Sequence, residues 1–466
     1  MIADLKAYPE YKESGLPWLG EVPGHWEVKR TKSAVENVVE QTAQMDSGDV
    51  YVALEHIESW TGRVRPQRGG HLFTGQVKRF RQDDVLFGKL RPYLAKVTRL
   101  QSKGVCVGEL FVLRARDASV RSDFLEHQLR AKHTIDVVNS STFGAKMPRA
   151  DWRFVGNLSL VFPPPDEQAA IVRFLDWANG RLERAIRAKR KVIALLNEQK
   201  QAIIHRAVTR GLDPSVPLKP SGIPWLGDIP QHWEVRRAKQ LCTAIIDCKN
   251  RTPDMVDGGE FVVVRTTNIR HGSFNPKGSY STDRRNFEIW TQRGAPRLGD
   301  VFFTREAPVG EACLVPHQGN LCMGQRMMYF RPNAAVLDAE FLLNSIYGPV
   351  VRRFIEIEAN GSTVGHLRLG QVSALPLSWC PIEEQKKIVA HITTESVPLC
   401  AAIARLEREI ELLREYRTRL VADVVTGKLD VREAAARLPE EVAPDTAEDD
   451  IDLSIDPEAA DEETVV

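Results

Sequence analysis

Several basic and polar side chains fall just after short apolar runs, at positions where a turn would expose them. Lys89, Arg91 and Tyr93 follow one such run, with a proline between them that stiffens the turn. Cations at such turns can contact phosphates, and Arg or Lys can also donate to base edges. The same pattern, a cation or polar residue after an apolar run or beside a glycine, gives the rest of the candidate set: Lys146, Arg149, Arg265, Thr266, Asn268, Arg270, Arg305, His366 and Arg368.

The distribution of charge favours a polyanionic partner for these residues. From Glu440 onward the chain has twelve acidic residues and no Lys or Arg, so residues 1–439 carry 63 basic and 50 acidic side chains, a net charge of +13. A basic body suits nucleic acid. The acidic segment, with few large apolar residues, is expected to be disordered. For each candidate residue, the ordinary alternative is a solvated surface charge.

Motifs that would carry catalysis are absent from the sequence. There is no G-x-x-x-x-G-K-[ST] phosphate loop, no N-P-P-[YF] or D-P-P-[YF] tetrapeptide of an amino-methyltransferase, and no Asp…Glu-x-Lys nuclease pattern. No His pair has metal-ligand spacing, and the seven cysteines are scattered without a C-x-x-C pair. We therefore expect no catalytic residue, no metal and no cofactor in this chain, and reduced cysteines typical of the cytoplasm.

Two long stretches that repeat without a gap must position the candidate residues. Residues 166–213 and 383–430 align at an offset of 217, with apolar residues on a seven-residue spacing that keeps one seam of a helix against a partner. Pro398 should kink or interrupt the second helix. The residues expected to pack between the helices are Leu182, Ile186, Ile193, Leu196, Ile203, Leu399, Ile403, Leu406, Ile410, Leu413 and Leu420.

A second repeat, residues 14–32 and 221–239, precedes each half at an offset of 207. The segments between block and helix each combine short β-rich runs with a short helix, which predicts a mixed α/β (α+β) fold. The expected strands are Val50–Leu54, Val85–Phe87, Leu110–Leu113, Phe261–Val264, Val301–Phe303 and Met327–Phe330, and the expected helices Phe124–Ala131 and Phe341–Tyr347. His25 and His232 are expected to be structural.

Three features together resemble the specificity subunit of type I restriction-modification systems. They are P-x-E/D-E-Q at the start of each long helix, the block S-G-x-P-W-L-G…H-W-E-V, and DDVLFGKLRPYLAKV at 83–97. The resemblance implies two similar target recognition domains, each reading half of a split DNA target, separated by two long helices in an antiparallel coiled coil with pseudo-two-fold symmetry. The second domain has TREAPVG (304–310) where the first has GKLRPYL (88–94), so the two half-targets should differ.

The resemblance also implies partners and boundaries. The expected partners are double-stranded DNA, two methyltransferase subunits and restriction subunits, with S-adenosylmethionine and Mg-ATP in those partners; no membrane partner is expected. The expected parts are recognition domain 1 (1–165), spacer helix 1 (166–213), recognition domain 2 (214–381), spacer helix 2 (382–433) and the acidic tail (434–466). Two alternatives stay open: a stand-alone sequence-specific DNA-binding protein, and an enzyme with an unrecognised active site.

Overall fold

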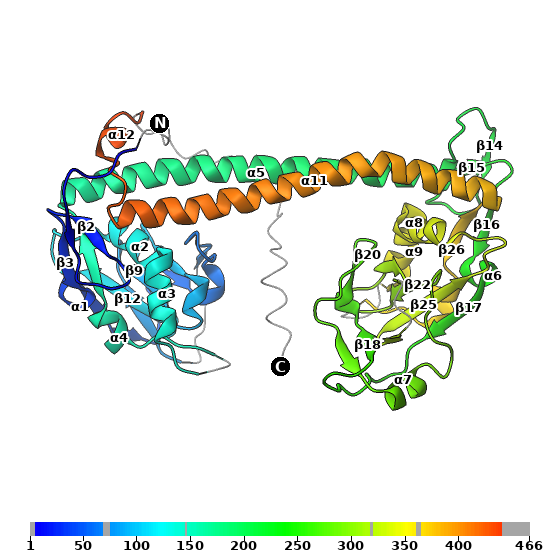
Figure 1. The fold of residues 1–466 in the computed structure, drawn as a ribbon, viewed down its shortest axis with the longest axis horizontal. Helices are drawn as coiled ribbons and strands as arrows, with labels where there is room; N and C mark the ends of the chain where they lie inside the picture. The colour runs from blue at the N-terminus through cyan, green and yellow to red at the C-terminus, as the bar shows by residue number, and fades with distance from the viewer. Residues whose placement is uncertain (1–4, 69–74, 145–146, 317–319, 360–364, 440–466) are drawn as a thin grey trace. The chain divides into compact units, whose positions relative to one another are not determined.

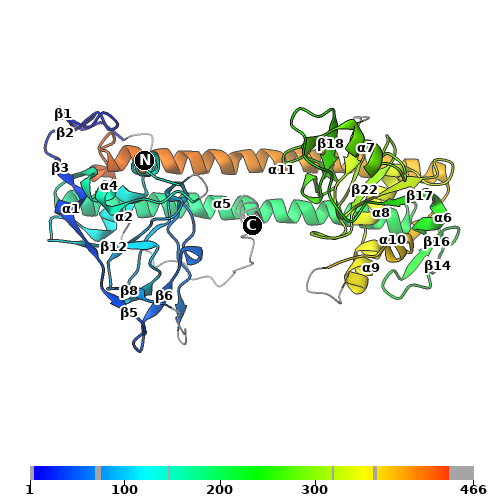
Figure 2. The same cartoon turned by 90° about the horizontal axis from the view of Figure 1, so that it is seen from below.

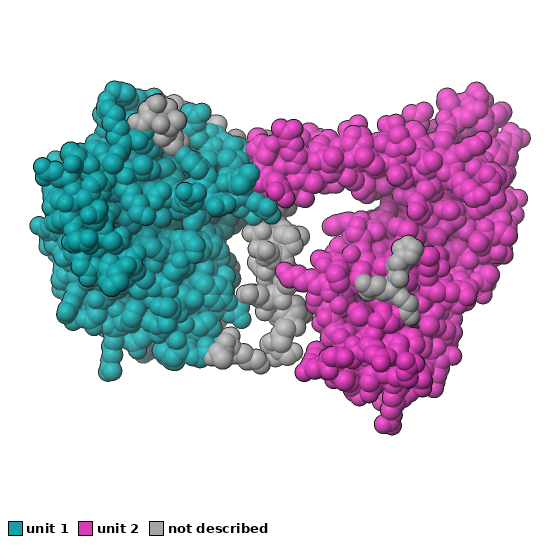
Figure 3. Space-filling view, in the orientation of Figure 1, with its two compact units in different colours: residues 1–186, 410–466 teal, residues 187–409 magenta. Residues whose placement is uncertain are grey.

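The computed structural model describes residues 5–68, 75–144, 147–316, 320–359 and 365–439, and it is mixed α/β (Figure 1). The chain divides into two compact units: unit 1 is residues 1–186 with 410–466, and unit 2 is residues 187–409 (Figure 3). Two long helices, α5 (Pro165–Arg210) and α11 (Ile382–Val425), each contribute residues to both units.

Unit 1 contains two main sheets. The first is antiparallel, with the order β10-β9-β12-β4; the second has the order β5-β8-β11-β6-β7, in which β6 and β11 are parallel. Of the two, the second lies farther from α5 (Figure 2). The strands of the first are β4 (Val35–Val38), β9 (Val85–Gly88), β10 (Val97–Arg99) and β12 (Leu110–Ala115); those of the second are β5 (Gln41–Thr42), β6 (Val50–Val52), β7 (Gln67–Arg68), β8 (Val77–Phe80) and β11 (Gly104–Cys106).

Short helices and two further strand pairs complete unit 1. The pairs are β1 (Tyr11–Glu13) with β2 (Glu21–Pro23), and β3 (Glu27–Arg30) with β13 (Ser159–Phe162); the helices are α1 (Thr31–Ala34), α2 (Ser122–Arg130), α3 (Lys132–Ser140), α4 (Trp152–Asn157) and α12 (Arg432–Ala436). The apolar face of α2, including Phe124, Leu125 and Leu129, is fully buried in the main core of the unit. That core also takes in the first turns of α5 and the last turns of α11.

Unit 2 has the same strand order in its larger sheet. This antiparallel sheet runs β23-β22-β25-β17, and a smaller sheet, β21-β18-β24, contains the parallel pair β18–β24. The larger sheet consists of β17 (Cys242–Asp247), β22 (Val301–Thr304), β23 (Ala312–Leu314) and β25 (Met327–Pro332), and the smaller of β18 (Phe261–Val264), β21 (Tyr280–Thr282) and β24 (Leu321–Met323).

The remaining elements of unit 2 are short. They are the strand pairs β14 (Leu218–Pro220) with β15 (Asp228–Pro230), β16 (Glu234–Arg237) with β26 (Pro376–Trp379) and β19 (Ile269–Arg270) with β20 (Ser273–Phe274), and the helices α6 (Ala238–Leu241), α7 (Arg284–Trp290), α8 (Ala339–Tyr347), α9 (Pro349–Ala359) and α10 (Leu369–Ser373). All six predicted strands and both predicted short helices are confirmed, to within two residues at each end.

The two long helices begin and end in similar ways. Each carries two acidic residues in its first turn, where the helix dipole favours negative charge. Each is followed by a glycine in the left-handed region, Gly211 at φ +70° and Gly427 at φ +78°. At Gly427 a Cβ would also lie 2.3 Å from the Pro23 side chain, so this position excludes any larger residue.

Of the kink or interruption predicted at Pro398, the interruption is wrong, since α11 runs unbroken through this residue. An internal proline removes one N–H···O bond and costs about 3 kcal/mol. The helix continues because both flanks are held by burial: Ile388 and Ile392 lie in the core of unit 2, and Leu420 and Val424 in that of unit 1. Packing outweighs the local preference.

The repeated tryptophan block fixes the start of each long helix through one glutamate. Glu167 accepts hydrogen bonds from Trp26 Nε1 at 3.0 Å and from the Tyr8 hydroxyl at 2.6 Å, and lies 2.7 Å from His25 Nε2. In unit 2, Glu384 accepts from Trp233 Nε1 at 3.0 Å, with His232 Nε2 at 2.8 Å. The structural role expected for both histidines is confirmed.

The glutamine that follows each glutamate also holds the start of its helix in place by hydrogen bonds. Gln168 Nε2 donates to the carbonyls of Pro163 and Ser119 at 2.8 and 2.7 Å, while its oxygen accepts from the Arg121 N–H. Gln385 makes the same three bonds, to Cys380, Val336 and Asp338. The recurring Glu-Gln pair therefore ties each helix to its neighbouring sheet and short helix.

The eleven side chains predicted to pack along the long helices are all at least half-buried. Ile186, Ile410 and Leu420 are buried, and the other eight are intermediate: Leu182, Ile193, Leu196, Ile203, Leu399, Ile403, Leu406 and Leu413. Charged positions of the same columns pair with acids on the other helix, Lys189 with Glu409 in unit 2 and Arg417 with Glu183 in unit 1.

The acidic tail was expected to begin at residue 434, but the structure has α12 there. Ala434, Ala435 and Leu438 are buried against unit 1, and Arg173 donates to the Leu438 carbonyl at 2.8 Å. These residues therefore belong to the fold of unit 1. The rest of the expected tail, residues 440–466, lies outside the described residues.

Candidate nucleic-acid interface

In unit 1, two of the loops singled out by sequence lie side by side. The turn after β9 meets the segment before α4: the Ala150 N–H donates to the Lys89 carbonyl at 2.9 Å, and the Arg91 N–H to the Pro148 carbonyl at 2.8 Å. Leu90 and Arg149 form an isolated β-bridge. The Lys89 N–H in turn donates to the Glu109 carbonyl at 2.8 Å. We call this arrangement the unit 1 junction, residues 89–91, 109 and 148–150.

The side chains of the unit 1 junction present mixed charge. Arg149 is half exposed and pairs with Glu109 at 3.1 Å. The Lys89 ammonium donates to the Gly108 carbonyl and lies 5.0 Å from the centre of the Phe111 ring. Arg91 has the left-handed φ of 49° and precedes the 3-10 turn η3 (Pro92–Leu94), which contains Tyr93. Lys146 lies outside the described residues.

Sequence reasoning missed Lys78, which lies beneath this junction. Lys78 is 8% exposed on β8 and donates to the Leu110 carbonyl at 2.8 Å. Burial, together with the neighbouring Lys89 ammonium, lowers the pKa of Lys78 to about 8. The stretch Val77–Phe80 reads V-K-R-F, so the sequence gives no local signal that Lys78 is buried. Its positive charge adds to the potential that a phosphate would meet at the junction.

The unit 2 junction, residues 305–306, 326 and 366–367, uses equivalent backbone bonds. The Leu367 N–H donates to the Arg305 carbonyl at 3.0 Å, and the Arg305 N–H to the Arg326 carbonyl at 3.1 Å. Glu306 and His366 form an isolated β-bridge. The candidates Arg305 and His366, 61 residues apart in sequence, are thus brought together.

The ion pairs of the unit 2 junction differ from those of unit 1. Arg305 is mostly buried and pairs with Asp247 at 3.1 Å. Glu306 lies 2.7 Å from His366 Nδ1 and 3.3 Å from Arg326 Nε. Arg326, about half exposed, was missed because the residue that occupies its place in unit 1 is the acidic Glu109.

The candidates after β18 separate into surface and interior residues. Asn268 is fully buried in the 3-10 turn η4 (Thr266–Asn268): its oxygen accepts from the Arg265 N–H, and its amide donates to the Asn275 and Lys277 carbonyls at 2.9 Å. Its prediction as a surface contact is therefore wrong. Arg265 and Arg270 are exposed, and Thr266 is half-buried.

The last candidate, Arg368, is exposed and directly precedes α10. A further basic cluster in the same unit surrounds Trp290 at the end of α7. The Lys249 and Arg251 cationic groups lie 5.7 and 5.4 Å from its ring centre, a cation–π arrangement. The offset between the two halves grows from 207 at Lys239 to 216 at Asp300, so this cluster falls in a stretch where unit 2 has extra residues.

Neither a metal-binding cluster nor a membrane-spanning helix occurs among the described residues. Over those residues there is no group of three or more His, Cys, Asp or Glu side chains placed to hold a metal ion. No helix within them is long and apolar enough to cross a membrane. All seven cysteines lie in described positions and are free thiols.

Comparisons with known proteins point to one family. Residues 230–411 match the model of the type I restriction modification DNA specificity domain. A putative type I restriction enzyme MjaX specificity subunit from Methanocaldococcus jannaschii is 21% identical over 452 residues, 91% of this chain and 98% of that protein. The type I restriction enzyme EcoDI specificity subunit from Escherichia coli is 21% identical over 208 residues, 44% of this chain and only 46% of that protein.

A solved structure supports the fold. A chain from a study of complex assembly and conformational transition in the type I R-M system superposes with a TM-score of 0.61, covering 88% of this chain and 99% of that one at 19% sequence identity. At this identity the likeness concerns the fold alone. Taken with the sequence matches, it shows that the chain is similar, over most of its length, to type I restriction-modification specificity subunits.

Proposed function

We propose that this chain is the non-catalytic DNA-recognition subunit of a type I restriction-modification complex. Its two recognition domains, residues 1–165 and 214–381, each read one half of a split, asymmetric duplex target. The observation that carries the proposal is the pair of equivalent junctions, in which the same backbone bonds present different side chains. A common scaffold with unlike surface chemistry is what two unlike half-sites require.

In this proposal, different side chains provide the affinity for DNA and the reading of its base sequence. Exposed cations such as Arg149, Arg265, Arg270 and Arg368 are placed to neutralise phosphates, with Lys89 and Lys78 adding charge behind the unit 1 junction. Specific reading of base edges needs donors and acceptors fixed in orientation. The side chains of Glu109 and Glu306 hold the neighbouring Arg149 and His366 side chains in such fixed positions.

The long helices, residues 166–213 and 382–433 with their flanks, act in this proposal as an antiparallel coiled-coil spacer in a tandem duplication. Supporting it, the start of α5 and the end of α11 share one core, while the end of α5 and the start of α11 share another. Methyltransferase subunits, two per complex, dock on this chain and supply S-adenosylmethionine chemistry; restriction subunits with Mg-ATP join through them. The complex acts in the cytoplasm, where its DNA target lies.

A footprint of the assembled complex tests this function. The chain with its methyltransferase subunits should protect two short tracts of duplex about one helical turn, roughly 34–36 Å, apart from centre to centre. Alanine at Lys89 and Arg149 should remove one tract and leave the other. Protection of a single continuous tract, or protection independent of base sequence, would contradict the proposal.

A further inference from the structure

Unit 1 contains a cavity of about 150 Å³ that the proposed function does not use. Its walls come from the loop around Trp60–Arg63, from the α2–α3 corner at Arg130–Lys132, and from one face each of α5 and α11. Four of its lining residues are cations, and among the described residues Glu183 is its one acidic lining residue. The cavity is therefore a small, positively charged space.

Two of the cations share the carboxylate of Glu183. Arg63 Nη1 lies 3.3 Å from one oxygen, and Arg417 Nη1 lies 3.3 Å from the other. Charge-assisted hydrogen bonds of guanidinium groups are usually 2.7–2.9 Å long and often two-pronged. Neither arginine reaches that geometry, and within the described chain no second carboxylate lies in ion-pair range of either one.

The free-energy cost of burying a charge is larger for Arg417 than for Arg63. Its side chain is 17% exposed, and burial lowers its pKa despite the nearby Glu183 and Glu58. The cationic groups of Arg414 and Arg130 act in the same direction. A buried cation with incomplete counter-charge is unfavourable unless a further anion completes it.

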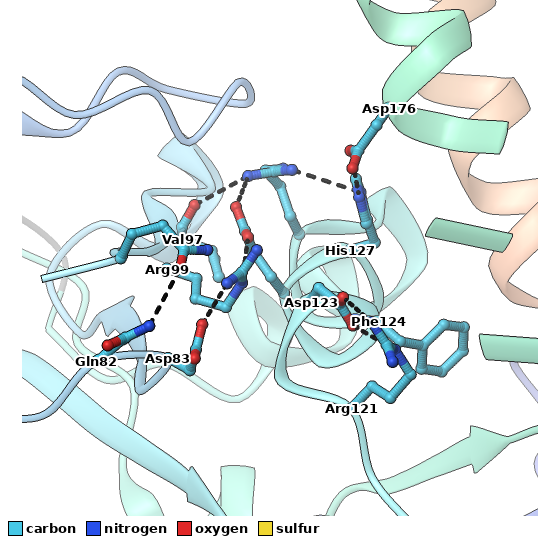
Figure 4. Close-up of polar contacts among 12 residues, drawn as sticks. Gln82, Asp83, Val97, Arg99, Arg121, Asp123, Phe124, His127 and Asp176 are labelled. Carbon is cyan, nitrogen blue, oxygen red and sulfur yellow. Dashed lines mark hydrogen bonds and ion pairs between the residues drawn. The ribbon is translucent and has the colours of Figure 1, made fainter. Parts of the chain in front are cut away.

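The other cations around the cavity are already compensated. Arg130 pairs with Glu126 at 2.7 Å and donates to the Val97 carbonyl at 3.1 Å. Figure 4 shows Val97 in this region, together with His127 of α2 and its partner Asp176 of α5. Gly62 makes room for Arg130, because a Cβ there would lie 1.9 Å from the Arg130 guanidinium. Lys132 pairs with Asp136 at 2.8 Å. The uncompensated positive charge is thus the one shared between Arg63 and Arg417.

Unit 2 has a cavity at the equivalent place, with different chemistry. Its volume is about 430 Å³, and its lining includes Lys200, Ser396, Val397 and Cys400. At the offset of 217 these residues correspond, in the same order, to Arg417, Asn179, Gly180 and Glu183, all of which line the unit 1 cavity. Both units therefore have a cavity at this position, but among the described residues only the unit 1 cavity is lined by a cluster of arginines.

One buried polar atom at each cavity lacks a hydrogen-bond partner among the described residues. In unit 1 it is Asn179 Oδ1, and in unit 2 it is Ser396 Oγ at the corresponding position. An asparagine amide carries an NH2 group with two N–H donors beside its oxygen. Since Asn179 lines the cavity, its NH2 group can donate to a group held by the two arginines.

We propose that the unit 1 cavity binds one small oxyanion, of the size of inorganic phosphate, between Arg63 and Arg417. Sites for drug-sized ligands measure roughly 300–1,000 Å³, so 150 Å³ excludes a nucleotide but accommodates a single tetrahedral anion. Donors from Arg63, Arg417 and Asn179 surround it. The anion then links the Trp60–Arg63 loop to α5 and α11 within unit 1.

Calorimetric titration of the full-length chain with inorganic phosphate, at constant ionic strength balanced by chloride, tests this site. Wild type should bind one phosphate per chain. Arg63→Leu and Arg417→Leu should each weaken binding by about tenfold or more, since each removes charge-assisted hydrogen bonds. Gly180→Leu should do the same by filling the space, and its added Cβ meets nothing closer than an arginine tip at 3.9 Å.

Two matched variants control for other phosphate sites. Lys200→Leu alters the residue that corresponds to Arg417 in the unit 2 cavity, and Lys189→Ala removes an ammonium group of α5 in unit 2 that lines neither cavity. Both should bind phosphate as wild type does. Absence of saturable binding to wild type would overturn the proposal, as would equal loss in these controls. If Arg417→Leu fails to fold, the Arg63→Leu variant still tests the proposal, because the Arg63 side chain is half exposed.

Discussion

The two junctions differ in side chains while their backbones agree. In unit 1 the residue that supplies the carbonyl beneath the turn is the acidic Glu109, paired with Arg149; in unit 2 it is the basic Arg326, paired with Glu306. The charge at this position is reversed, yet each turn is held by the same pair of backbone bonds. Because main-chain bonds hold the loops in place, the side chains can differ between the two units without loss of the loop structure.

The largest expected effect concerns the helix starts. Glu167 is 6% exposed and receives three partners, whereas Glu384 is 29% exposed and receives two. Glu167→Ala should lower the free energy of unfolding by about 3 kcal/mol, because it leaves the buried Trp26 N–H unpaired, and Glu384→Ala by about 1–2 kcal/mol. Urea denaturation followed by tryptophan fluorescence measures both. A larger loss in Glu384→Ala would contradict this ranking.

Next in size is the loss of DNA affinity from each junction. Lys89→Ala with Arg149→Ala should weaken binding by on the order of 100-fold, at about 1–3 kcal/mol for each charged contact, and Arg326→Ala with His366→Ala should do likewise. Competition with duplexes in which one half-site is scrambled assigns each loss. The two double variants should respond to opposite scrambled halves. Sensitivity to the same half would show that the junctions do not act separately.

A smaller effect depends on pH and belongs to unit 1 alone. The Lys78 pKa of about 8 lies below the ordinary lysine value of 10.5, so between these values the unfolded chain binds more protons than the folded one. Stability should therefore rise with pH through this window, and below pH 8 the folded state retains the cost of the buried charge. Lys78→Met should remove this rise. Denaturation midpoints at pH 7.5 and 9.5 measure it, and the same rise in both proteins would contradict it.

The smallest effect is expected from an exposed pair on the long helices. Lys189 and Glu409 form an ion pair in unit 2 with both side chains partly exposed. Exposed pairs contribute little to stability. Lys189→Ala should leave the denaturation midpoint and DNA affinity nearly unchanged, whereas Glu183→Ala in unit 1, which strands the mostly buried Arg417, should shift the midpoint clearly. Equal shifts of the denaturation midpoint in the two variants would contradict this ranking of the two ion pairs.

Much of the fold could be predicted from the sequence because its signals are local or repeated. The seven-residue spacing gave both long helices, and apolar runs gave the six strands. The roles of Glu167 and Asn268 could not be predicted in this way. Glu167 contacts residues about 140 positions away, and Asn268 is buried by carbonyls of a loop that follows it. Those contacts exist only after the chain has folded.

The candidate site was predictable in position more than in detail. Glycine, proline and basic residues marked the loops that meet at each junction. No local rule indicated that Arg305 would form an ion pair with Asp247, or that Lys78 would lie next to Lys89. Pro398 failed as a helix breaker for the opposite reason, since packing on both flanks outweighs a local preference. Ion pairs between residues that are distant in sequence decide which charged side chains remain available to contact DNA.

Mapping of methylated adenines across the DNA of cells that carry this chain and its methyltransferase partner tests the central claim most directly. The proposed function predicts one motif made of two different short half-sites separated by a constant gap. A single uninterrupted motif, or two identical half-sites in inverted order, would contradict the assignment of a separate half-target to each unit.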